Sequence, residues 1–224
     1  MKLPLAKFSI QGSNFLFKIS NKHEQADNKS VKKIIASYIS VIGHPLLTIP
    51  VFAVIALFTY LEFQRALLIS LLIVGGVFVP LVVKMYAGSK RGTYTNFDVS
   101  NKTQRQSWYV FAILLLLIVT IILFVTDYPR ILRFSVLFSL ILLATSQTIN
   151  YFIKSSLHVS FNIFLSFLII PINFMAGLIF LFFTIPIVWS RLTLNRHTVK
   201  EIIVGSIIGL TIGISFLLTV SVTF

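Results

Sequence analysis

The sequence has 224 residues but no cysteine and very few acidic residues. Without cysteine, disulfides, thiolate metal sites and cysteine nucleophiles are all excluded. The few carboxylates are scattered along the chain, so they cannot form the aspartate-rich magnesium site that prenyl-transfer enzymes need. We therefore expect no metal site and no other cofactor. The acidic residues are Glu24, Asp27, Glu62, Asp98, Asp127 and Glu201.

Charge of either sign is also scarce. Only 11% of the residues are charged, against about 25% in a typical soluble domain, while 57% are hydrophobic and the mean hydropathy is +0.95. This composition excludes an ordinary soluble globule and a disordered chain. The remaining charge is basic, with 19 Lys and Arg against 6 Asp and Glu. In so apolar a chain, the partners it indicates are an anionic lipid bilayer and phosphate-bearing ligands.

Two other classes of ligand find no support in the sequence. A nucleotide-binding loop needs closely spaced glycines followed by Lys-Ser or Lys-Thr, and none is present. Single-stranded nucleic-acid binding needs exposed aromatic residues interleaved with the basic residues. The lysine-rich N-terminal segment does not show this pattern, so we expect no nucleic-acid partner. The sequence indicates no particular oligomeric state.

The chain divides into a polar and an apolar part. Residues 1–33 are rich in lysine and are interpreted as a basic polar N-terminal arm. Because residues 1–17 lack the unbroken apolar run and the small-residue cleavage site of a signal peptide, we expect the arm to be retained. Residues 34–224 are interpreted as one transmembrane domain.

The apolar part contains a close succession of hydrophobic runs. A helix needs about 20 residues to cross roughly 30 Å of hydrocarbon, and most of the runs are long enough. The fifth is short and is followed by Pro171, so the fifth and sixth can also form a partly re-entrant hairpin. The sequence thus predicts an all-α, polytopic transmembrane helix bundle with six to seven spans. The runs lie near 35–61, 65–84, 107–126, 131–152, 156–170, 172–190 and 198–222.

The distribution of basic residues predicts an orientation. With seven spans, all of the 19 Lys and Arg residues except Arg65, Arg130 and Arg133 fall on the side of the N-terminus. The positive-inside rule places that side in the cytoplasm. We therefore expect an integral protein of a bacterial inner (plasma) membrane with a cytoplasmic N-terminus.

Polar residues gather in three clusters at the ends of spans. They occupy residues 98–105, 154–158 and 190–201, and two spans separate each cluster from the next. An even number of crossings returns the chain to the same membrane face, so the three clusters are expected to converge. On the span count, this face is the cytoplasmic one.

The residue types in these clusters suit a phosphate group. Arg105 and Arg191 offer forked donors, Lys154 a point charge, and Ser156 a hydroxyl donor. Arg191 ends an apolar helix, where an unpaired charge is costly, so a substrate phosphate is a plausible partner for it.

Two histidines in the clusters can supply acid–base and nucleophilic chemistry near neutral pH without a metal. They are His158 and His197, and Glu201 lies four residues after His197 on the same helical face. The carboxylate can therefore orient the ring and stabilise its protonated form. An alternative role for Glu201 is helix capping, because Thr198 and Glu201 form a Thr-x-x-Glu capping box before an apolar run.

Other residues of the same types are interpreted as structural. His44 precedes Pro45 at the mouth of the first span, and His23 lies in the arm, so both are expected to be structural or solvated. Glycines at 205, 209 and 213 recur every four residues along the last span. This spacing predicts a face for close helix packing rather than a ligand loop.

The clusters resemble the three signatures of the type-2 phosphatidic-acid phosphatase superfamily over roughly residues 98–210. Ser190-Arg191, five residues, His197, three residues and Glu201 resemble the third signature, Ser-Arg-x5-His-x3-Asp. Ser155-Ser156-Leu157-His158 is similar to the second, Pro-Ser-Gly-His, and Arg105 fits the arginine of the first, Lys-x6-Arg-Pro. The departures are Asp98 for the lysine, Gln106 for the proline, Leu157 for the glycine and Glu201 for the aspartate.

The resemblance implies roles for these residues. His197 would be the nucleophile that forms a phosphohistidine, His158 would protonate the leaving oxygen, and Glu201 would assist His197. Arg105, Arg191 and Ser156 would hold the phosphate oxygens. Because Asp98 occupies the position of the signature lysine, Lys102, or Lys90 together with Arg91, would supply that charge.

Residues 34–224 would then be a transmembrane lipid-phosphatase-like domain. The expected activity is metal-independent hydrolysis of a phosphomonoester or diphosphate of a membrane lipid. The alternative is a non-hydrolytic relative that binds or translocates anionic lipids with the same pocket, which the changes at Asp98 and Glu201 favour. A third possibility is a purely structural or assembly subunit.

Overall fold

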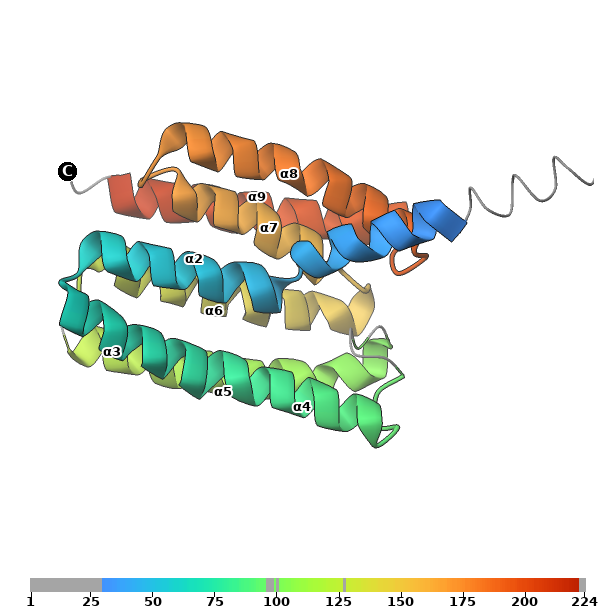
Figure 1. Cartoon of the computed structure of the whole chain (residues 1–224), viewed down its shortest axis with the longest axis horizontal. Coiled ribbons are helices and arrows are strands. Elements are labelled where there is room, and N and C mark those ends of the chain that lie inside the picture. Colours follow the sequence, from blue (N-terminus) through green and yellow to red (C-terminus); the bar gives the residue numbers. More distant parts are fainter. Residues whose placement is uncertain (1–29, 96–98, 100, 127, 222–224) are drawn as a thin grey trace, which may run out of the picture.

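The computed structural model describes residues 30–95, 99, 101–126 and 128–221, and within these residues the chain is all-α. The elements run back and forth along one axis (Figure 1). They are α2 (Pro45–Tyr60), α3 (Phe63–Ile73), the π-helical turn η1 (Val74–Phe78), α4 (Val79–Lys90), α5 (Lys102–Val125), α6 (Arg130–Phe152), α7 (Leu157–Ile169), α8 (Phe174–Thr193) and α9 (Val199–Ser221). A further helical segment, 30–42, precedes α2.

Six helical stretches of the described chain are long and apolar enough to cross a membrane, which confirms the predicted polytopic bundle. Large hydrophobic side chains on their outer faces are exposed, as expected for surfaces that contact lipid. Of the predicted arm, residues 1–29 lie outside the described residues, whereas residues 30–33 are already helical. The six stretches are Ser30–Tyr60, Phe63–Lys90, Thr103–Val125, Arg130–Phe152, Phe174–Thr193 and Val199–Ser221.

The fifth hydrophobic run forms α7, which is the centre of the bundle. With 13 residues it is about 20 Å long, shorter than a full membrane span. Its first ten residues are all buried, and it packs most extensively against α9 and α8. Because neighbouring helices enclose it, α7 does not need the length of a lipid-exposed span. It lies antiparallel to α8, to which it is joined by a short turn (Figure 1).

Glycines of α9 allow its backbone to contact α7 directly. A Cβ added at Gly205 would lie 2.7 Å from the carbonyl oxygen of Ser156, and one at Gly209 would lie 2.6 Å from that of Ser160. Both distances are shorter than a side chain tolerates. The predicted packing face of the last span is therefore confirmed, and it holds α9 against the start of α7.

A break at Gly43 and His44 separates the helical segment 30–42 from α2. Pro45 cannot donate a backbone hydrogen bond and begins α2, and His44 caps this helix by accepting a hydrogen bond from Leu46 N at its Nδ1 (3.1 Å). Asn162 of α7 donates from Nδ2 to Gly43 O (2.8 Å). The break is thus tied to the central helix, which brings His44 to the end of the bundle where α7 begins.

Candidate functional site

One small pocket of about 40 Å³ collects basic residues from distant parts of the chain. It lies at the end of the bundle where α5, α7 and α9 begin and α6 and α8 end (the right-hand end in Figure 1). The predicted convergence of the three clusters is therefore correct for the described residues. The site residues that line the pocket are Arg105, Lys154, His158, Arg191 and His197.

The turn between α8 and α9 returns His197 to the pocket beside Arg191. Asn195 adopts a left-handed backbone conformation (φ 52°), which asparagine tolerates better than most residues. Its N–H donates to Leu192 O (3.0 Å), and Arg196 N donates to Arg191 O (3.0 Å). This pair of bonds is a Schellman motif, which ends α8 and reverses the chain. The five residues between Arg191 and His197 thus belong to the helix cap, which sets the spacing of these two site residues.

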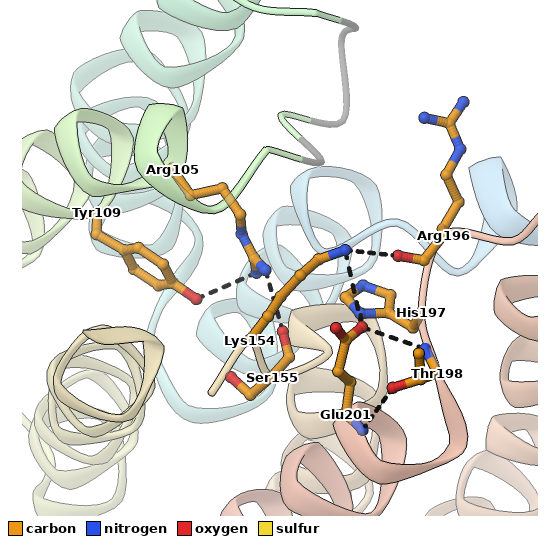
Figure 2. A network of polar contacts seen from close by, with 8 residues as sticks. All are labelled: Arg105, Tyr109, Lys154, Ser155, Arg196, His197, Thr198 and Glu201. Carbon is orange, nitrogen blue, oxygen red and sulfur yellow. Dashed lines mark hydrogen bonds and ion pairs between the residues drawn. The ribbon is translucent and has the colours of Figure 1, made fainter. Parts of the chain in front are cut away.

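Glu201 orients His197 and caps α9 with the same carboxylate (Figure 2). His197 Nδ1 lies 2.8 Å from Glu201 Oε2, and because an ionised carboxylate only accepts, Nδ1 carries the hydrogen. The lone pair of the neutral ring is then on Nε2. Thr198 N also donates to Oε2 (3.2 Å), and Glu201 N donates to Thr198 Oγ1 (3.4 Å). The capping box and the carboxylate–imidazole pair, weighed as alternatives, are both present.

Lys154 connects the α6–α7 segment to the α8–α9 turn. Its Nζ donates to Arg196 O (2.7 Å) and lies 3.7 Å from Glu201 Oε2 (Figure 2). Burial lowers the pKa of the Lys154 ammonium below its usual value, and the positive charges of Arg105 and Arg191 lower it further, whereas Glu201 opposes the shift. Lys154 is therefore fixed by these contacts and lies in the positive electrostatic potential of both arginines.

Arg105 is buried at the first turn of α5, with 5% of its surface exposed. Its guanidinium donates to Ser155 O (3.1 Å) and to the Tyr109 hydroxyl (3.2 Å) (Figure 2). Both partners are neutral, so they orient the side chain without cancelling its charge. The sequence reasoning did not identify Tyr109, which lies one helical turn after Arg105.

Arg191 is buried at the end of α8, with 3% of its surface exposed. Its Nη1 donates to the hydroxyl of Ser40 (2.7 Å), a buried residue of the helical segment 30–42. The first helical segment therefore contributes to the site, although none of its residues was among the candidates.

His158 and His44 lie against each other in the pocket. Their ring centroids are 4.6 Å apart in an edge-on arrangement. The expectation that His44 is structural holds, since it caps α2, but this residue also lines the pocket. Asn162 donates both to His158 O (2.7 Å) and to Gly43 O, so one amide fixes the two histidine-bearing segments together. The sequence feature that could have indicated this role is the His44-Pro45 pair at the start of a span.

Not every candidate reaches the pocket. Ser156 is fully buried at the start of α7 and is absent from the described residues that line the pocket. Its backbone N–H donates to Glu201 O (3.1 Å), because its main chain packs directly on α9. Lys102 begins α5, but its side chain lies outside the described residues, as does Asp98.

The arrangement holds the types of group that binding a tetrahedral phosphate and accepting a phosphoryl group on nitrogen require. Arg105, Lys154 and Arg191 supply positive charge, His197 presents a lone pair, and His158 supplies a group that can carry a proton. In comparisons with protein-family models, curated proteins and solved structures, no match to this chain was found. The function is therefore inferred from these residues.

Proposed function

We propose that this integral membrane protein is a lipid phosphatase, which hydrolyses a phosphomonoester or diphosphate of a membrane lipid through a phosphohistidine without a metal. The observation that carries the proposal is the pocket that places His158 and His197 among Arg105, Lys154 and Arg191. The order and spacing of these residues, which resemble the signatures of type-2 phosphatidic-acid phosphatases, support it.

In the first step, His197 Nε2 attacks the phosphorus of the bound lipid phosphate. The new P–N bond forms as the bond between phosphorus and the lipid oxygen breaks. His158, in its protonated form, transfers a proton to that oxygen, so the lipid leaves as an alcohol, or as a monophosphate from a diphosphate. Glu201 stabilises the positive charge that develops on the His197 ring, since Nδ1–H donates to its carboxylate.

In the second step, water attacks the phosphohistidine. The neutral His158 accepts a proton from the water, the P–N bond breaks, and the electron pair returns to His197 Nε2. Inorganic phosphate is released and both histidines regain their starting protonation states. Arg105, Lys154 and Arg191 contact the non-bridging oxygens in both steps, where negative charge is concentrated in the transition state.

The proposal is tested by reconstituting the protein in liposomes with EDTA and measuring phosphate release from a panel of lipid phosphates. His197→Ala is expected to abolish release, while His23→Ala, a change to a histidine of the N-terminal segment, is the matched control and keeps it. Equal release by the wild type and His197→Ala, or no release from any substrate, would overturn the proposal.

The same preparation distinguishes the non-hydrolytic alternative. Thermal unfolding is measured with and without lipid phosphates. If these lipids stabilise the wild type but not Arg105→Ala or Arg191→Ala, the pocket binds the headgroup. Binding of this kind with no turnover would favour a protein that binds or translocates anionic lipids.

We further propose that the site faces the cytoplasm of a bacterial plasma membrane, on the basis of the asymmetric distribution of Lys and Arg. Asn101 caps α5 at the same end of the bundle as the pocket. In intact cells, Asn101→Cys is expected to resist a membrane-impermeant thiol reagent and to react after permeabilisation. Ready labelling of intact cells would place the site on the opposite face.

A further inference from the structure

Trp108 lines the polar pocket, although the proposed function gives it no role. It lies three residues after Arg105 on α5, and residues at this spacing are neighbours on one side of a helix. Its ring packs against the buried cluster of Met85, Tyr94 and Val99. These contacts fix the indole in the wall of the pocket.

The polar atom of Trp108 is buried, although part of its ring is exposed. Its Nε1 makes no hydrogen bond within the described part of the chain. An indole N–H can only donate, and a buried donor is usually paired in a native protein. The second tryptophan of the chain, Trp189 on α8, is 39% exposed and is not among the described residues that line the pocket. The unpaired donor is therefore a feature of position 108, and a ligand oxygen can pair it.

The surroundings of Trp108 favour an anionic acceptor. Arg105, Lys154 and Arg191 line the same pocket, and their charged groups can only donate hydrogen bonds. An anion attracted by these cations brings acceptor oxygens, and a charged acceptor makes a stronger hydrogen bond than a neutral one. Because the oxygens of a phosphate point in several directions, one such group can contact the cations and the indole together.

We propose that Trp108 is a further phosphate-binding residue, whose Nε1–H donates to a non-bridging oxygen of the phosphate in the polar pocket. The inference rests on the proposed function, which supplies that phosphate on a lipid or as the free product. The cations attract any anion, whereas a fixed, neutral N–H favours an oxygen at one position. Trp108 thus makes the binding of phosphate directional without adding charge.

The indole signal in an NMR spectrum tests this contact directly. Because the chain has two tryptophans, Trp189→Phe leaves Trp108 as the reporter, and Trp108→Phe leaves Trp189 as the matched control. Both variants are prepared in lipid nanodiscs with isotope-labelled tryptophan and titrated with inorganic phosphate and, separately, with an alkyl phosphonate. The indole proton of Trp108 is expected to shift downfield, as protons in hydrogen bonds to anions do, while that of Trp189 stays in place.

The two ligands distinguish the sources of the phosphate. A shift of the Trp108 signal with both ligands supports the proposal for headgroup and product alike. A shift with the phosphonate alone supports it for the lipid headgroup, and a shift with inorganic phosphate alone supports it for the free anion. No shift of the Trp108 signal with either ligand, or an equal shift of the Trp189 signal, would overturn the proposal.

A second measurement removes the N–H and keeps the shape of the side chain. In Trp108→benzothienylalanine, sulfur replaces the indole N–H. The affinity for the phosphonate, measured by calorimetry, is expected to fall roughly tenfold or more, the value of a hydrogen bond to a charged group. Thermal stability without ligand is not expected to fall, because the variant loses only an unpaired donor. If Trp108 merely packed in the wall, the affinity would not change, and the proposal would be refuted.

The role of Trp108 and the proposed function can fail separately. A shift of the Trp108 signal without phosphate release from any lipid phosphate would support the role of Trp108 and overturn the proposed hydrolysis. Phosphate release that is unchanged in Trp108→benzothienylalanine, with no shift of the Trp108 signal, would overturn the role of Trp108 and leave the proposed function intact.

Discussion

Replacing Glu201 by glutamine tests the role of the carboxylate that lies against His197. Glutamine keeps an oxygen that can accept from Thr198 N and so preserves the cap of α9. It removes the negative charge that faces His197 Nδ1 at 2.8 Å. We therefore expect Glu201→Gln to lower kcat while the free energy of unfolding changes little.

The size of the loss follows from the interaction that is removed. A hydrogen bond to a charged group is worth about 1.5–3 kcal/mol. The charge on the His197 ring appears only as Nε2 bonds to phosphorus, so most of this energy belongs to the transition state. At about 1.4 kcal/mol for each factor of ten, kcat is expected to fall by roughly 10- to 150-fold.

The control for this experiment is Thr198→Ala. This change removes the hydroxyl that accepts from Glu201 N and keeps the carboxylate. It is expected to cost about 1 kcal/mol of stability, as losses of helix caps do, with kcat close to that of the wild type. Single-turnover phosphate release and thermal unfolding are measured for both variants. If Glu201→Gln kept full kcat, or if Thr198→Ala lowered it equally, the carboxylate would be a cap and no more.

Three further predictions concern other parts of the molecule. Burial lowers the pKa of Lys154, so its positive charge is lost as the pH rises through that lowered value. Arginine stays charged, and Lys154→Arg is therefore expected to extend the alkaline limb of the pH profile of kcat/KM. An unchanged alkaline limb would refute this. Gly209→Ala brings a Cβ to 2.6 Å from the backbone of α7 and should destabilise the bundle by about 1–3 kcal/mol in thermal unfolding, whereas Gly75→Ala, with open space around it, should be nearly neutral. His44→Asn can still cap α2 but loses the ring against His158, and should lower kcat by roughly 2- to 12-fold, as expected for an aromatic pair worth about 0.5–1.5 kcal/mol.

The spans and the convergence of the polar clusters could be predicted because a membrane restricts the chain so strongly. Backbone groups in hydrocarbon must be paired within a helix, so each long apolar run reads directly as a span. Whether the number of spans between two loops is even or odd then decides whether they lie on the same side of the membrane. This reasoning correctly placed Arg105, Lys154, His158, Arg191 and His197 at one end of the bundle without any tertiary information.

The contributions of the first helical segment and of α2 could not be predicted in the same way. Asn162 fixes the break at Gly43 against α7, and the packed bundle thereby brings Ser40 and His44 to the site. For Ser156 the error is the opposite one, because its position in the sequence predicts a phosphate ligand. The close approach of α9 at Gly205 instead places the Ser156 backbone in a helix–helix contact.

The proposed affinity for phosphate depends on the positive charge of the site. Arg105, Lys154 and Arg191 bring three positive charges to the pocket, and Glu201 is the carboxylate that contacts them within the described residues, through Lys154 at 3.7 Å. Arg105 and Arg191 are both buried, in a setting where positive charge is costly. A phosphate monoester carries about two negative charges near neutral pH. In the proposed function, its negative charge would face the buried Arg105 and Arg191, and these arginines would supply the affinity for the headgroup.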